Sequence, residues 1–307
     1  MSGAAVYVKD GIIYDYRGKV LVYDFFIRDS TLYFISTFEN SNGPELTIKI
    51  DDQTIKETAL KEPEPVRYFS CPYTGPERIV AVINGCSLSL SAPIIKPLRH
   101  GLAICTLFKH ESPADVLRFV EYYRMQGVTA FYLYYNGPLS ALVNMPQDYD
   151  IIYKPWDFNY WNTGSGYRHC AQSVFLTMVR CRYLASCDWL ALIDLDEFII
   201  GSRLLCDYLK DCADVDVIRI RNYWSTRDGL TLLYSAVPGT WTDRTKCIYR
   251  GSFRGEFAIH GPKVRCKPIC YYKELQAADL KLLHVIDVLH PDRKDLLVPP
   301  LLVTLYT

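Results

Sequence analysis

Residues 189–200 read WLALIDLDEFII, an apolar run that passes directly into three carboxylates within four positions. The apolar part predicts a buried strand, whose end brings Asp194, Asp196 and Glu197 to one place. Carboxylates are costly to bury without a partner, so this cluster needs a cation, a hydrogen-bond network or solvent to remain charged. Ligands of open α/β sheets bind beyond the carboxyl ends of the strands, and the cluster lies at such an end.

A divalent metal is the simplest cation for this cluster. Oxygen ligands suit Mg²⁺ and Mn²⁺, which keep open positions for the phosphates of a nucleotide. The alternative is a solvated acidic loop after a core strand, because Asp-x-Asp is a short and common sequence. Glu197 has two interpretations of its own, since it either orients a ligand or bonds to the backbone.

The flanking segments predict an alternation of strands and helices. Apolar strands are expected at residues 102–108, 131–135 and 150–153. One helix is capped by Ser112 and ends at Gly127, and a second, at residues 167–187, leads into the acidic strand. The order strand, helix, strand, strand, helix, strand is typical of an α/β sheet.

Three segments resemble glycosyltransferase family 92 and its neighbours among the GT-A glycosyltransferases. They read ESPADVLRFVEYYRMQGVTAFYLYYNG, YRHCAQ and DWLALIDLDEFII. The positions that match the family's motifs are Glu121, Tyr122, Gly127, Val128, Phe131, Tyr132, Tyr134, Asn136, Arg168, Gln172, Asp194, Asp196, Glu197 and Phe198. The similarity covers about residues 102–288 and weakens after Gly201. It implies an α/β fold of GT-A type (Rossmann-like), a mixed sheet flanked by helices.

The family is one of inverting transferases that use a nucleotide-sugar donor and Mn²⁺ or a similar ion, such as Mg²⁺. By this resemblance Asp196 contacts the metal directly, and Asp194 reaches the ribose or a metal-bound water. Two histidines fall in segments similar to the family's later motifs, and imidazole is a suitable ligand for Mn²⁺. The predicted metal ligands are therefore Asp194, Asp196, His260 and His284. A satisfied core histidine is the alternative for each imidazole.

An inverting mechanism also needs a general base that removes the proton of the acceptor hydroxyl. The segment after residue 215 should supply it, and the candidates there are Asp228 and Glu256. Each of these acids has a surface or structural role as its alternative.

Contacts to the nucleotide are less visible in the sequence. Neither a Gly-x-Gly-x-x-Gly fingerprint nor a Walker loop is present, which argues against a Rossmann dehydrogenase or a P-loop enzyme. By analogy with GT-A enzymes, we predict that the donor is bound by residues at strand ends and on the second helix, together with Asp194. These residues are Thr106, Lys109, Asn136, Arg168 and Gln172.

The N-terminal third has a different pattern from the rest of the chain. Short alternating runs such as TLYFISTF and RIVAVING, separated by Gly, Asn, Asp and Pro, predict a β-sandwich or meander. We therefore expect a β-rich domain at residues 1–97 and a GT-A glycosyltransferase domain at residues 98–307. We expect the N-terminal domain either to bind a glycan or only to cover the edge of the transferase sheet.

Composition narrows the partners and the compartment. The formal net charge is zero and no basic run occurs, which argues against a nucleic-acid partner. We see neither a signal peptide nor an apolar stretch long enough for a transmembrane segment. The 11 cysteines form no Cys-x-x-Cys pair, and Asn-x-Ser/Thr does not occur. A soluble, cytoplasmic enzyme is the expectation.

We thus predict a metal-dependent inverting hexosyltransferase that moves a sugar from a UDP- or GDP-sugar to a glycan or glycoprotein acceptor. Galactose is the sugar that the resemblance suggests. One alternative is a non-catalytic glycan-binding protein on a degenerate transferase domain. Another is a different metal-dependent enzyme that handles phosphate, such as a haloacid dehalogenase phosphatase. That type has Asp-x-Asp-Gly-Thr near its N-terminus, whereas Glu197 and Phe198 follow the motif here.

Overall fold

The computed structural model describes residues 6–37, 46–60, 66–96, 100–160, 170–228, 231–235, 245–262, 273–285 and 300–304. By the contacts between its residues, the chain divides into two compact units. The first comprises Met1–Leu98, Phe158–Ala185 and Glu256–Ala258, and the second Arg99–Asp157, Ser186–Gly255 and Ile259–Thr307.

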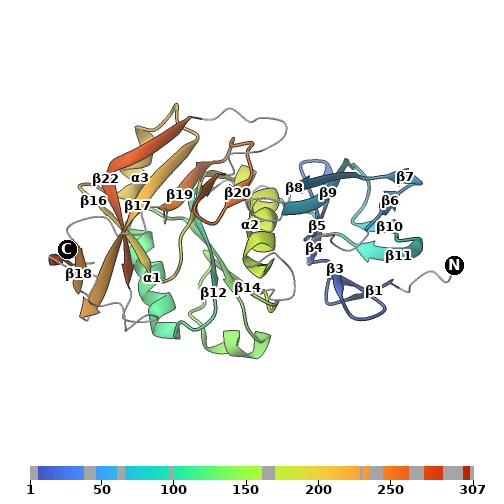
Figure 1. The fold of residues 1–307 in the computed structure, drawn as a ribbon, viewed down its shortest axis with the longest axis horizontal. Coiled ribbons are helices and arrows are strands. Elements are labelled where there is room, and N and C mark those ends of the chain that lie inside the picture. The colour runs from blue at the N-terminus through green and yellow to red at the C-terminus, as the bar shows by residue number, and fades with distance from the viewer. Residues whose placement is uncertain are drawn as a thin grey trace. The chain divides into compact units, whose positions relative to one another are not determined.

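The first unit is built mainly from three antiparallel sheets (Figure 1). The first sheet contains β1 (Val6–Lys9), β2 (Ile12–Asp15) and β3 (Val20–Val22). The second contains, in order, β4 (Asp24–Arg28), β5 (Thr31–Ser36), β9 (Val66–Pro72) and β8 (Lys56–Leu60). The third contains, in order, β11 (Cys86–Ser91), β10 (Arg78–Ile83), β6 (Ile48–Ile50) and β7 (Gln53–Thr54). Alternate residues of these strands, among them Leu32, Phe34 and Ile48, are buried in one apolar core. The run KVLVYDFFI is not one strand, because Tyr23 separates β3 from β4 and the two lie in different sheets.

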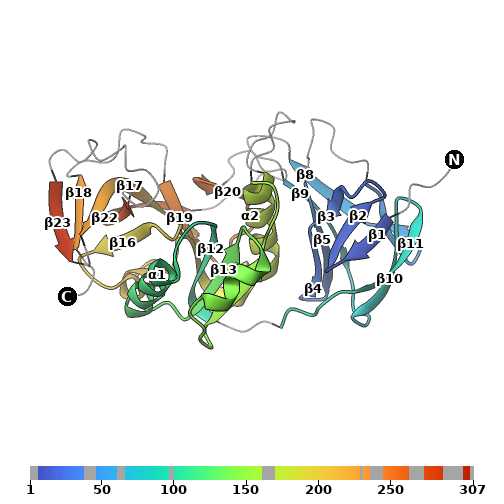
Figure 2. The ribbon, with the colours of Figure 1, turned by 90° about the horizontal axis from the view of Figure 1, so that it is seen from below.

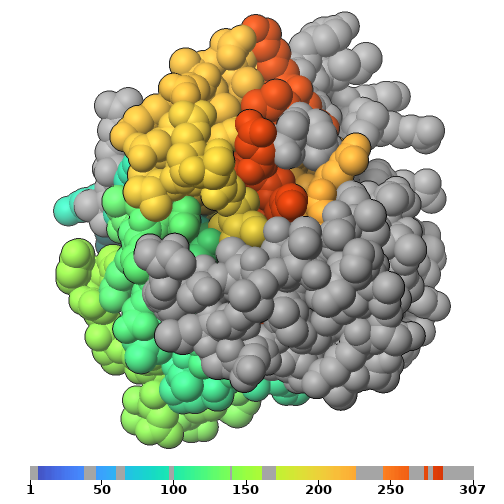
Figure 3. Space-filling view, turned by 90° about the vertical axis from the view of Figure 1, so that its left-hand side faces the viewer, coloured from blue at the N-terminus to red at the C-terminus, as the bar shows by residue number. Residues whose placement is uncertain are grey.

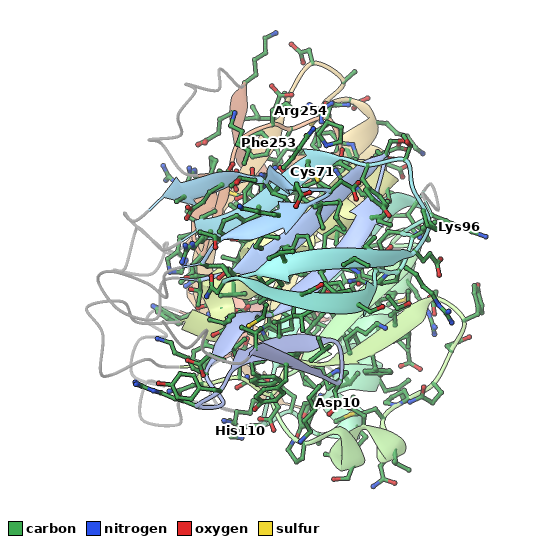
Figure 4. The ribbon with its side chains drawn as sticks, turned by 90° about the vertical axis from the view of Figure 1, so that its right-hand side faces the viewer. Asp10, Cys71, Lys96, His110, Phe253 and Arg254 are labelled. Atoms are coloured by element: carbon green, nitrogen blue, oxygen red, sulfur yellow. The ribbon has the colours of Figure 1, made fainter. Side chains whose placement is uncertain are left out.

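Four hairpins of this unit turn through two residues with positive φ, as type I′ turns do. The turns are Asp10–Gly11, Asp29–Ser30, Asp51–Asp52 and Asn84–Gly85, with φ between 48° and 81°. Asp10 is labelled at the first of them in Figure 4. Asp-Gly and Asn-Gly are the favoured pairs for this turn, whereas Ser30 and Asp52 adopt the left-handed conformation without being glycine.

Helix α2 (Cys170–Tyr183), followed by the 3₁₀ turn η2 (Leu184–Ser186), packs on the N-terminal strands through arginines. Arg180 donates to both carboxylate oxygens of Glu256, at 2.7 and 2.6 Å, and to the hydroxyl of Tyr68 at 2.8 Å. Arg182 donates to Asp24 at 2.6 Å. These bidentate and buried contacts explain why a segment far along the chain groups with the first unit.

The second unit contains a mixed sheet of ten strands among the described residues (Figures 1 and 2). Along its main path the order is β14 (Ile151–Pro155), β13 (Ala130–Tyr135), β12 (His100–Phe108), β15 (Cys187–Leu192), β19 (Thr245–Arg250), β17 (Val217–Asp228), β18 (Thr231–Ser235) and β23 (Pro300–Thr304). Beside this path β22 (Glu274–Val285) pairs with β17 and with β16 (Glu197–Gly201). Its other short elements include η1 (Leu139–Asn144), α3 (Leu205–Lys210) and β21 (Gly261–Pro262), while β20 (Phe257–Ala258) belongs to the first unit.

In the parallel part of this sheet, the order in which the chain adds strands reverses at β12. From β12 the chain adds β13 and then β14 on one side, and β15 then pairs with β12 on the other side, all in parallel. The carboxyl ends of β12 and β15 therefore flank a topological switch point, which is where open α/β sheets bind their ligands. The register aligns Cys105 with Leu192, so the acidic segment follows directly beyond this end of the sheet.

Helix α1 (Pro113–Met125) has the predicted cap and supports the acidic segment. The Ser112 hydroxyl accepts from the Asp115 N–H at 3.2 Å, and the Asp115 carboxylate accepts from the Ser112 N–H at 3.3 Å. The helix lies beside β12 and β16 in Figure 2, and its buried aromatic side chains pack on Phe198. It ends at Met125, and Gly127, two residues further on, has a φ of +88°.

The predicted fold class is confirmed, since a large mixed sheet with a few helices follows a β-rich N-terminal region. None of the helices in the described residues has the length and apolar character that a membrane span requires.

Candidate functional site

The segment from Asp194 to Glu197 is a tight turn between β15 and β16. The Glu197 N–H donates to the Asp194 carbonyl at 3.0 Å, which closes the turn. In return the Asp194 N–H donates to a carboxylate oxygen of Glu197 at 2.9 Å. The Asp196 carbonyl accepts from the Val285 N–H at 2.8 Å, which fixes the turn to β22. Glu197 therefore bonds to the backbone, as one of its two interpretations predicted.

Two tyrosines of α1 hold the strand that follows this turn. The Tyr123 hydroxyl donates to the Glu197 carbonyl at 3.1 Å and accepts from the Ile199 N–H at 3.0 Å. The Tyr122 hydroxyl donates to the Ile199 carbonyl at 2.5 Å. The Glu-Tyr-Tyr sequence of α1 thus has a physical role, because both phenols position the acidic turn through backbone groups of β16.

Lys246 of β19 supplies a buried cation to the turn. Its ammonium group forms ion pairs with Asp194 and, at 3.2 Å, with Glu197, and the residue is only 6% exposed. Burial on its own lowers the pKa of Lys246, but Asp194 and Glu197 outweigh this effect and raise the pKa well above its ordinary value. Lys246 is therefore charged at neutral pH. No sequence pattern indicates a role for this lysine.

His284 of β22 faces the other carboxylate of the Asp-x-Asp pair. Its Nε2 atom lies 3.1 Å from Oδ2 of Asp196, and its Nδ1 atom lies 3.4 Å from Oε1 of Glu197. Burial lowers the pKa of His284, but Asp196, through charge and hydrogen bond, and the other carboxylates raise it to about 9. Burial raises the pKa of Asp196, yet His284 and Lys246 together bring it below its ordinary value.

Glu197 is the carboxylate whose charge is least favoured. It is 2% exposed, and burial raises its pKa to about 7 despite the opposing charge of Lys246. Lys246 and His284 thus place positive charge beside the three carboxylates without any added ion.

Strand register explains why these side chains meet. Glu197 pairs with His284 across β16 and β22, and His284 pairs with Trp224 across β22 and β17. Directly paired residues point to the same face of a sheet, and the Trp224 and His284 rings are 5.1 Å apart. Figure 3 shows the orange-red surface of β22 beside the gold surface that includes β17.

A small cavity of about 50 Å³ opens onto this cluster. It is lined by Asp194, Glu197, Asn222, Thr245, Lys246, His260, Leu282 and His284. A single water needs about 10–15 Å³, so this cavity holds a few waters or part of a polar ligand. His260 contributes through its position in the wall, and its carbonyl accepts from Thr245 at 2.5 Å and from Arg219 at 2.9 Å.

The donor set has the chemistry of a site for a hard divalent cation. Neighbouring ligands of an octahedral Mg²⁺ or Mn²⁺ ion lie about 3 Å apart, since the metal–oxygen distance is about 2.1 Å. The Asp196 and His284 donor atoms have such a separation, 3.1 Å. Within the described ranges no group of three His, Cys, Asp or Glu side chains is arranged around one metal position. A pair of protein ligands is nevertheless sufficient for an ion that keeps waters and substrate phosphates.

The residues predicted to bind the nucleotide at strand ends lie in the same unit as this cluster. Thr106 is buried, and its hydroxyl has no hydrogen-bond partner among the described residues. Lys109 is exposed, and the Asn136 amide donates to the Trp156 carbonyl at 2.7 Å. Between them Glu111 accepts from the N–H groups of Lys109 and His110, and its pKa is raised by burial and by Asp196. Glu111 is thus an acid near the cluster that sequence reasoning did not select.

The other predicted residues have separate outcomes. Gln172 lies half-buried on α2, in the first unit. Glu256 also belongs to that unit, where both of its carboxylate oxygens accept from Arg180. Asp228 is the last residue of β17 and pairs with Thr231, but its side chain lies outside what the structure describes. Arg168 lies outside the described residues altogether.

Comparison with known proteins identifies the family. The model of glycosyltransferase family 92 matches residues 100–295, which include the strands and turn that form the cluster. The chain belongs to glycosyltransferase family 92. No curated protein matches it.

Solved structures similar to this family 92 protein include one described as a glucose-1-phosphate thymidylyltransferase from Bacillus anthracis, in complex with sucrose. The two chains are 9% identical, the match covers 50% of this chain and 73% of that one, and the TM-score is 0.28. At this level the similarity carries no argument about the site.

Proposed function

We propose that this family 92 glycosyltransferase is a metal-dependent inverting hexosyltransferase of the GT-A type. Its donor would be a UDP- or GDP-sugar, with galactose the first sugar to test, and its acceptor a glycan or glycoprotein. The observation that supports the proposal best is the Asp196–His284 pair, 3.1 Å apart, beside the buried Lys246 at the carboxyl end of the parallel strands.

Asp196 and His284 would hold Mn²⁺ or Mg²⁺, with Asp194 and His260 as further predicted ligands. When bound, the ion neutralises the negative charge that develops on the departing diphosphate. Lys246 carries a second positive charge at the same cavity, where it can donate to a phosphate oxygen. Glu197 keeps both the Asp194 backbone and the Lys246 ammonium group in position.

The transfer itself follows the chemistry of an inverting enzyme. The acceptor hydroxyl attacks the anomeric carbon from the face opposite the nucleotide, and a new carbon–oxygen bond forms. The bond from that carbon to the diphosphate breaks, its electron pair leaves with the nucleotide, and the hydroxyl proton passes to a carboxylate base. Asp228 is our proposed base. Glu256 is the weaker candidate, because a base needs a free lone pair and Arg180 occupies both of its oxygens.

The nucleotide would lie along the ends of β12 and β13, with Thr106, Lys109 and Asn136 as the proposed contacts. Arg168 and Gln172 stay predictions from the family resemblance. A cytoplasmic location stays a prediction from cysteine usage and from the lack of Asn-x-Ser/Thr sites.

The proposal is tested by thermal stabilisation with a panel of nucleoside diphosphates and nucleotide-sugars, each with and without Mn²⁺. A ligand that binds only the native state raises the thermal midpoint by an amount set by its concentration and dissociation constant. We expect stabilisation by one nucleotide family only when Mn²⁺ is present. Asp196→Asn should remove that response, measured by titration well below the midpoint. Absence of any nucleotide response in the native protein would instead favour a non-catalytic glycan-binding protein.

A further inference from the structure

Asn222 is a buried polar residue whose side chain is unsatisfied. It lies in β17 and is 4% exposed. Neither its Nδ2 nor its Oδ1 atom has a hydrogen-bond partner among the described residues. A buried polar group without a partner costs about 1–3 kcal/mol of stability, and such groups in native proteins require an explanation.

The position of Asn222 supplies that explanation. It pairs with Leu282 of β22, two residues before the Trp224–His284 pair, so it lies on the same face of the sheet as His284. Two residues before Asn222 in β17, Ile220 pairs with Lys246 of β19. Asn222 lines the cavity that contains Asp194, Lys246 and His284. Asn222 therefore borders the space in which the donor would be handled.

The chemistry of the missing partner follows from the two free atoms. A metal ion would satisfy only Oδ1, because it accepts a lone pair. A phosphate oxygen would satisfy only Nδ2, because it accepts a hydrogen bond and has no hydrogen to donate. A hydroxyl group both donates and accepts, and two neighbouring hydroxyls on a ring can bond to Oδ1 and Nδ2 together. A sugar is the ligand that carries such groups.

We infer that Asn222 binds hydroxyl groups of the donor hexose and is a specificity-determining residue of this site. The inference rests on the proposed function, since the hexose is joined directly to the diphosphate that Lys246 and the metal would hold. Asn222 then selects among sugars, because a site built to bond a hydroxyl rejects a ligand that lacks it.

The experiment measures dissociation constants by calorimetry with Mn²⁺ present, for the native protein and for Asn222→Leu. Leucine has nearly the same volume and removes both unsatisfied atoms, so the variant should fold with an equal or higher thermal midpoint. We expect its dissociation constant for UDP or GDP alone to stay within about twofold. For the matching nucleotide-sugar the constant should rise roughly 10- to 100-fold.

A deoxy analogue of the same nucleotide-sugar identifies the hydroxyl. The native protein should bind the analogue more weakly than the parent donor, whereas Asn222→Leu should bind the two equally. Ser225→Ala is the matched control. Ser225 is fully buried in the same strand, its hydroxyl has no partner among the described residues, and its position in the strand alternation is on the opposite face. It should leave both constants unchanged.

Three results would overturn the inference. One is an Asn222→Leu variant that binds the nucleotide-sugar as tightly as the native protein, which would make the amide the partner of a buried water. Another is a native protein that binds free UDP or GDP but no nucleotide-sugar. The third is a native protein that binds neither nucleotide nor nucleotide-sugar with Mn²⁺, and only this result removes the proposed function as well.

Discussion

The Nε2 atom of His284 lies 3.1 Å from the Oδ2 atom of Asp196, and the pairing of β16 with β22 holds the two side chains together. In the metal-free protein this contact is an ion pair, because the pKa of His284 is raised to about 9. A histidine whose pKa is higher in the folded protein than its unfolded value of about 6.5 stabilises the folded state. This stabilisation is fully present at pH values below about 6.5.

The first prediction is a loss of stability with rising pH in protein treated with EDTA. The contribution of His284 is fully present below about pH 6.5 and disappears as the pH rises through about 9, a change of at most about 3 kcal/mol. Denaturant unfolding from pH 6 to pH 10, for the native protein and for His284→Gln, measures it. The difference between the two proteins should shrink over this range. A constant difference would contradict an ion pair.

Lys246→Met should destabilise the protein, because it leaves the buried carboxylate of Glu197 without its cation, whereas the side chain of Asp194 is 42% exposed and can be solvated. Removing one partner of a buried pair costs about 3–5 kcal/mol. Denaturant unfolding at pH 7 gives the value. Lys210→Met is the control, since its pair with Asp207 at 2.6 Å is exposed and should be worth nothing measurable. Equal midpoints for the two variants would show that the cluster does not depend on Lys246.

Gly127→Ala should cost more than the left-handed backbone alone accounts for. Gly127 has φ +88°, and a Cβ atom there would lie 2.5 Å from the Cβ atom of Cys206. Gly85→Ala separates the two effects, since Gly85 has φ +81° and open space around it. We expect about 1 kcal/mol for Gly85→Ala and at least twice that for Gly127→Ala, from denaturant midpoints. Similar losses of stability in the two variants would mean that α3, which contains Cys206, moves aside at no cost in free energy.

Glu256→Gln tests whether this acid has a structural or a catalytic role. Since Arg180 would lose its charged partner, we expect a fall in stability of several kcal/mol, measured by denaturant unfolding. The double variant Arg180→Met/Glu256→Met should be less destabilised than Glu256→Gln, because it buries no unpaired charge. A Glu256→Gln protein of native stability that has lost sugar transfer would instead restore Glu256 as the general base.

The local elements of the second unit could be predicted from sequence because their signals lie within short segments. Ser112, Pro113 and Gly127 mark the ends of α1, and apolar runs mark β12, β13 and β15. In the first unit, the Asp-Gly and Asn-Gly turns carry a similar signal. The mixed sheet followed from the order of these elements.

The rest of the candidate site could not be predicted in this way. Lys246 and His284 reach the acidic turn through pairings of β19 and β22 with distant strands, and no local pattern specifies which strands pair. The family resemblance alone predicts His284, and nothing in the sequence predicts a role for Lys246. Asn222 is in phase with Ile218, Ile220 and Trp224 in the alternation of β17, which predicts a buried position, but only the three-dimensional structure shows the cavity that it lines. Asp194 stays a predicted metal ligand, and the structure adds an ion pair between its carboxylate and Lys246 that the sequence does not indicate.

The antiparallel pairing of β16 with β22 has a consequence for synthesis. Glu197 leaves the ribosome long before its register partner His284, so the nascent chain carries the acids of the site before their imidazole counterpart exists. Until β22 docks, the carboxylates remain solvated and Asp196 lacks its neighbour. The proposed metal pair of Asp196 and His284 can therefore form only after β22 has been synthesised, and a chain that ends before His284 would lack it.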